Sequence, residues 1–143
     1  MGGLLAFRVI YFLMALSCAI SGIWMLVSPI GWYHSFPAAI PDTGPLNPHF
    51  IRDIGVTFSI IAATLSWGAS RRQPIWSLHF VLMSFFVGHA LLHIADLITA
   101  RLPPSHWLLD SVSVFLPAVV MITLALPPVW RAVTTTSWLI KTR

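Results

Sequence analysis

Histidine and aspartate side chains recur at a spacing of four along this chain, which places the members of each pair on one face of a helix. Asp96 continues one of these stripes three residues further on. Imidazoles and carboxylates on helices can ligate a metal, relay protons or bond across a helix interface. The three pairs are His49 with Asp53, His89 with His93, and His106 with Asp110.

A metal site is the first interpretation of this pattern. The nitrogen and oxygen ligands suit zinc, copper(II), iron or manganese, and inward-facing histidines and carboxylates are how helical bundles build such sites. Arg52, His106 and Asp110 would balance the charge of the ligands or hold them in place. The predicted ligands are His49, Asp53, His89, His93 and Asp96.

Three other uses of the same residues stay open. Two histidines on different helices, for instance His49 with His89 or His93, could bind haem b. Histidines that titrate near neutral pH also suit a proton or quinone site. The polar groups could instead only hydrogen-bond across helices and fix their register.

The composition indicates an integral membrane protein. The chain of 143 residues is 57% hydrophobic and 8% charged, whereas about a quarter of an average soluble domain is charged. Its single cysteine, Cys18, excludes an internal disulfide framework. The basic residues lie between apolar runs and form no patch, so we expect no nucleic acid partner.

Four apolar runs predict the elements that carry these residues: 4–27, 48–69, 75–100 and 106–126. Each is close to the roughly 20 residues that a membrane-spanning helix needs. Asn47 before Pro48 predicts a capped helix start, Pro117 predicts a kink, and Pro127 ends the fourth run. We therefore expect one all-α domain over 1–143, a bundle of four transmembrane helices.

The basic residues set the expected orientation. Six basic residues lie on the same side as both termini, and two, Arg52 and Arg101, lie on the other side. Because cytoplasmic loops carry the excess of basic residues, we expect both termini in the cytoplasm. The residues 129–143, with tryptophans and basic side chains, would lie along the inner interface. The six are Arg8, Arg71, Arg72, Arg131, Lys141 and Arg143.

This orientation gathers the polar groups in the outer half of the membrane. Asp53, Asp96 and Asp110 all fall there, and among the histidines only His79 lies in the inner half. Ionisable groups inside a membrane are costly unless they are paired or hydrated. We therefore expect the aspartates to face one another, with Arg52 as their cation.

Two further segments carry expectations. The connection 28–47 is rich in apolar and aromatic residues, which favours a lid or a short interfacial helix over the outer mouth of the bundle. Small residues in the first span would let another helix approach closely, either one of this chain or one of a partner membrane subunit. They are Ala15, Ser17, Cys18, Ala19 and Gly22.

One motif resembles a known group of proteins. The run Gly44-Pro45-x-Asn47-x-His49-x-x-Arg52-Asp53-x-Gly55 resembles the start of the second helix in small four-helix bacterial inner-membrane proteins, and the layout is similar to that of DoxX-like proteins. The resemblance implies a multi-pass protein of the bacterial inner (plasma) membrane. It singles out His49, Arg52, Asp53, His89 and His93, and it implies no reaction.

The sequence thus predicts a small membrane protein with an outer-facing His/Asp/Arg site. The site would bind a metal and serve a redox or respiratory complex in the membrane. The alternative is a non-catalytic accessory or assembly subunit, whose polar residues only join helices.

Overall fold

The computed structural model describes residues 2–135, and the regular structure in this range is all helical, with no strand. Four stretches are long and apolar enough to span a membrane, as the apolar runs predict: α1, α3, α4 and the stretch His106–Ala125. The last of these consists of α5, a π-helical turn η2, and α6. The elements are α1 Gly2–Val27, α2 Pro29–Ser35, η1 Ile40–Thr43, α3 Pro48–Ser70, α4 Trp76–Ile98, α5 His106–Asp110, η2 Ser111–Phe115, α6 Leu116–Ala125 and α7 Pro127–Thr135.

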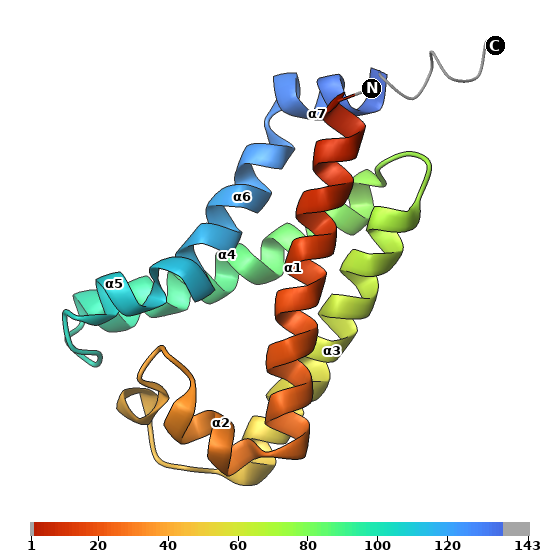
Figure 1. Cartoon of the computed structure of the whole chain (residues 1–143). Coiled ribbons are helices and arrows are strands. Elements are labelled where there is room, and N and C mark those ends of the chain that lie inside the picture. Colours follow the sequence, from red (N-terminus) through yellow and green to blue (C-terminus); the bar gives the residue numbers. More distant parts are fainter. Residues whose placement is uncertain (1, 136–143) are drawn as a thin grey trace.

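The spanning helices form two antiparallel pairs (Figure 1). Helix α1 packs along α3, and α4 packs against α6, while α3 and α4 have few contacts with each other. The pairs lie close at the end where α7 crosses the bundle and diverge toward the end that carries α2 and η1. This divergence opens the interior of the bundle at one end.

Small residues explain the close packing of α1 on α3. Gly22 is buried, and a Cβ there would lie 2.9 Å from Ser59 Oγ and 3.0 Å from the carbonyl oxygen of Gly55. Ala15 and Cys18 of the same face are also buried. Three of the five small residues, Ala15, Cys18 and Gly22, are therefore buried within the chain, whereas Ser17 is exposed.

Local signals set the helix boundaries. The side chain of Asn47 accepts a hydrogen bond from the backbone N–H of Phe50 at 3.1 Å, and Pro48 opens α3, as predicted. Pro127 opens α7. The fourth span departs from α-helical geometry in η2, just before Pro117, since proline lacks the N–H that continues the ladder. The predicted kink is thus a π-helical turn.

His79 joins three helices at the narrow end of the bundle and is fully buried. Its Nδ1 lies 2.5 Å from the Tyr11 hydroxyl, and its Nε2 lies 3.1 Å from the carbonyl oxygen of Met121. Because a carbonyl only accepts, Nε2 carries the hydrogen and Nδ1 accepts from the tyrosine. His79 is therefore separate from the other histidines, as expected, and has a structural partner on each nitrogen.

The predicted interfacial tail is described only in part. Helix α7 contains Trp130, whose ring packs against Trp76 with centroids 4.8 Å apart. The remainder of the tail, including Lys141 and Arg143, lies outside the described residues.

Candidate functional site

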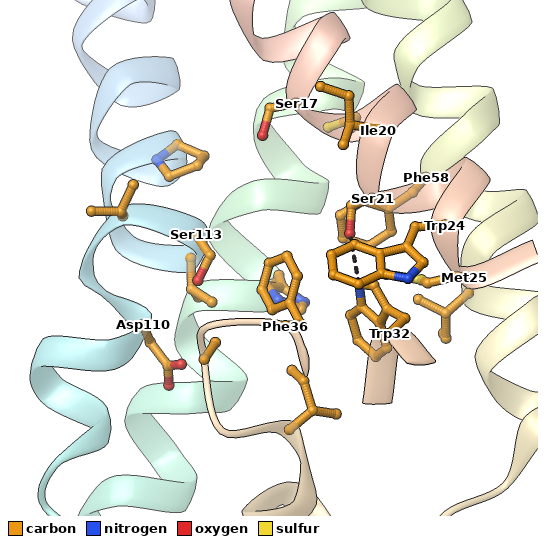
Figure 2. Close-up of a pocket in the computed structure, with 18 of the residues that line it drawn as sticks. Ser17, Ile20, Ser21, Trp24, Met25, Trp32, Phe36, Phe58, Asp110 and Ser113 are labelled. Carbon is orange, nitrogen blue, oxygen red and sulfur yellow. Dashed lines mark hydrogen bonds between the residues drawn. The ribbon is translucent and has the colours of Figure 1, made fainter. Parts of the chain in front are cut away.

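A cavity of about 1220 Å³ lies between the two helix pairs. Its walls come from α1, α3, α4, the α5–α6 stretch and the segment 28–47, and they are mostly apolar. Figure 2 shows Ser17 on the α1 wall and Ser113 and Asp110 on the opposite wall. A large apolar cavity with a few polar groups is typical of a small-molecule binding site.

Aromatic residues of the segment 28–47 form one end of the cavity. The indole N–H of Trp32 donates to Ser21 Oγ at 3.1 Å, which fixes α2 against α1 (Figure 2). The hydroxyl of Tyr33 donates to the carbonyl oxygen of Gly44 at 2.6 Å and holds the segment in a compact fold. The side chain of Phe36 lies between the wall of Asp110 and the wall of Trp24 (Figure 2).

Two histidines of α4 line the cavity side by side, with ring centroids 4.8 Å apart. His89 stacks on Phe85, with centroids 6.0 Å apart and planes 16° apart, and meets the edge of Phe58. Within residues 2–135, neither ring nitrogen of His89 has a hydrogen-bond partner. His89 is thus a polar group held between aromatic rings, with its bonding capacity unused.

His93 belongs to a chain of four bonded side chains. Its Nδ1 lies 2.8 Å from Oδ2 of Asp110, which in turn lies 3.2 Å from Nδ1 of His106. Nε2 of His106 lies 3.3 Å from Oδ2 of Asp42 in η1. The side chains of Asp110 and His106 are 2% and 0% exposed, whereas those of His93 and Asp42 are 17% and 43% exposed.

The predicted pair His49 and Asp53 exists but lies elsewhere. Nε2 of His49 is 3.6 Å from Oδ2 of Asp53, and the two side chains are 89% and 61% exposed at the start of α3. Neither residue lines the cavity. The pair faces outward because the buried face of this turn is formed by Ile51 and Gly55 instead.

The expected roles of Arg52 and Asp96 are wrong. Among the described residues, Arg52 pairs with no aspartate, whereas Arg101 Nη1 lies 3.3 Å from Asp96 Oδ1. The backbone turns back after α4 through Ala100, whose φ is 56°, and this turn brings Arg101 beside Asp96. Asp96 is therefore paired with Arg101 and does not line the cavity with His89 and His93.

The five predicted ligands are consequently not gathered at one point. Of them, only His89 and His93 line the cavity. In the part of the chain that the structure describes, no group of three or more His, Cys or Asp side chains is arranged to hold a metal ion. His106 and Asp110, predicted as supporting groups, are central to the bonded chain instead.

Asp42 is the site residue that the sequence reasoning missed. It is 64 positions from His106, so no local spacing links the two. The sequence contains one indication of this role, because Asp42 is the one acidic residue in the segment 28–47, which is rich in apolar and aromatic residues.

Comparison of the chain with protein-family models, curated proteins and solved structures finds no match.

Proposed function

We propose that this protein binds a membrane-soluble molecule of the quinone class in the cavity, with its polar head beside His89 and His93. The observation that carries the proposal is the unpaired imidazole of His89 in an apolar cavity. His89 is partly exposed, and a hydrogen bond that it forms on ligand binding contributes about 0.5–1.5 kcal/mol. A ligand whose oxygen bonds to this imidazole would gain that contribution.

The chemistry of His93 fits such a head group. Where Nδ1 of a neutral His93 donates its hydrogen to Asp110, Nε2 of the ring is left as an acceptor. A quinol hydroxyl would donate to this nitrogen, and a quinone carbonyl would accept from the protonated ring. The pair of imidazoles can therefore bind both redox states of one ligand.

The remainder of the cavity suits an apolar ring and tail. Some apolar side chains of α1 and of the η2–α6 stretch line the cavity and are also exposed at the surface of the described chain. In a bilayer, exposed apolar side chains of this kind face lipid tails. This arrangement favours sideways entry of a ligand from the membrane. The residues are Leu13, Leu16, Ile20, Val112 and Leu116.

The cellular setting belongs to the same proposal. The charge distribution supports cytoplasmic termini, which would put the segment 28–47 on the outer side as a lid over the cavity. The DoxX-like layout supports the bacterial inner membrane, and we propose a partner redox complex in that membrane. That complex would supply or take the two electrons that accompany two protons when a quinone and its quinol interconvert.

A fluorescence titration tests the binding proposal. Trp24 and Trp32 line the cavity, so a short-tailed ubiquinone bound there should quench their emission in detergent micelles. We expect saturable quenching by the wild type. His89→Leu should weaken binding about tenfold or more, because one hydrogen bond to the head is lost.

His49→Leu is the matched control, because His49 is exposed and outside the cavity. It should bind the quinone like the wild type. Quenching that never saturates, or that is equal in His89→Leu and the wild type, would refute the proposal. Such a result in a folded protein would favour the accessory-subunit alternative.

A further inference from the structure

The bonded chain from His93 to Asp42 connects the cavity to the surface. Its first member lines the cavity, its two middle members are almost inaccessible, and its last member is a partly exposed carboxylate on η1. Every link is 3.3 Å or shorter. The path crosses three elements, from α4 through α5 to η1, so it is not a by-product of one helix face.

The residues alternate between imidazole and carboxylate. His106 is bonded through both ring nitrogens, Nδ1 to Asp110 and Nε2 to Asp42. An imidazole bonded on both sides can accept a proton on one nitrogen while it releases the proton of the other. Chains of aspartate and histidine that carry protons are a recurring use of ionisable groups in membranes.

We propose that His93, Asp110, His106 and Asp42 form a proton relay between the cavity and the aqueous phase at Asp42. The relay does not depend on which molecule occupies the cavity. It assigns an activity to the chain, namely proton exchange between the cavity and the surface at Asp42.

The transfer can be followed bond by bond. A proton donor in the cavity protonates Nε2 of His93, and the Nδ1 proton of His93 passes to Asp110. Asp110, in the form that already donates its own proton to Nδ1 of His106, passes that proton on, and the Nε2 proton of His106 passes to Asp42 and then to water. Each step breaks one N–H or O–H bond and forms another, so one proton enters and one leaves. The reverse sequence carries a proton inward.

The other ionisable groups near this path are His89 and the pair of Asp96 and Arg101. His89 lies beside His93 in the cavity, on the ligand side of the chain. Asp96 and Arg101 pair with each other at the end of α4. Because Asp42 belongs to η1, the relay is complete only when the segment 28–47 is seated against α5.

Hydrogen–deuterium exchange of the imidazole N–H groups tests the relay. The protein labelled with nitrogen-15 histidine would be transferred to deuterated buffer in micelles, and the N–H signals of His93 and His106 would be followed by NMR. His→Gln variants assign these signals. We expect Asp42→Asn to slow their exchange about 100-fold, because an amide of the same shape does not take up and release protons near neutral pH.

Asp53→Asn is the control, since it neutralises another exposed aspartate that is outside the chain. It should leave both exchange rates at the wild-type value. Asp42 is exposed enough for its replacement to leave the fold intact, and the unchanged signal of His79 would verify this. Equal exchange in wild type and Asp42→Asn would refute the relay. The quinone titration is separate, so either proposal can fail alone.

Discussion

Replacement of Asp110 by alanine should destabilise the protein strongly. The Asp110 side chain is 2% exposed and bonds to His93 of α4 and His106 of α5. Its removal leaves Nδ1 of both imidazoles without the carboxylate, in a place that water hardly reaches. The loss of these hydrogen bonds therefore weakens the contact between α5 and α4.

The structure sets the size of the effect. A hydrogen bond to a charged group contributes about 1.5–3 kcal/mol, and breaking a buried charged pair costs about 3–5 kcal/mol. Two such bonds meet at one carboxylate, so we expect Asp110→Ala to lower the free energy of unfolding by about 3–5 kcal/mol. Asp53→Ala removes only an exposed pair, which contributes about 1 kcal/mol at most.

The free energy of unfolding of both variants can be measured in mixed micelles. The fraction of dodecyl sulfate is increased as the denaturant, and helical circular dichroism is the signal. Asp110→Asn should fall between Asp110→Ala and the wild type, because the amide oxygen still accepts one hydrogen bond. A loss in Asp110→Ala no larger than that in Asp53→Ala would refute the reasoning. It would mean that the buried carboxylate is not a stabilising partner of the two histidines.

The same unfolding assay checks three further predictions. Gly55→Ala should be less stable than Gly88→Ala by about 1–3 kcal/mol, because a Cβ at Gly55 would lie 2.9 Å from an α1 side chain, whereas nothing lies within 4 Å at Gly88. The gain in helix propensity is the same in both, so equal stabilities would contradict the close packing of α1 on α3. Tyr11→Phe should cost about 1–3 kcal/mol, since it removes the donor to buried His79, and an unchanged stability would exclude that bond. Asn47→Ala should cost about 1 kcal/mol and Asn47→Asp much less, because aspartate still caps the helix; equal losses would contradict the cap.

The elements of the fold could be predicted from local chemistry. Spans follow from apolar run length, and the start of α3 follows from Asn47 and Pro48, because both signals act within a few residues. The same holds for the pair His106 and Asp110, one helical turn apart. Spacing of this kind determines which side chains lie together on one face of a helix. It does not determine which other element that face contacts.

The site required tertiary information. Asp96 shares a helix stripe with His93, yet the turn at Ala100 places Arg101 beside it and removes it from the cavity. Asp42 reaches His106 only because η1 is folded against α5. Both outcomes depend on connections between helices, where no hydrophobic periodicity constrains the backbone.

The hydrogen-bond and ion-pair partners of the histidines also indicate which histidine is most important for the ligand-binding proposal. His49 and His106 each have a carboxylate within reach, and both nitrogens of His79 are bonded, so their positions are explained by contacts inside the chain. His89 is different, because its only described neighbours are the aromatic rings and the imidazole of His93. A polar network that served only to join helices would have no use for such a residue, since apolar side chains would pack there at lower cost. The case for a ligand therefore depends on the cavity-lining histidine that lacks a hydrogen-bonding partner among the described residues, more than on the number of ionisable groups around it.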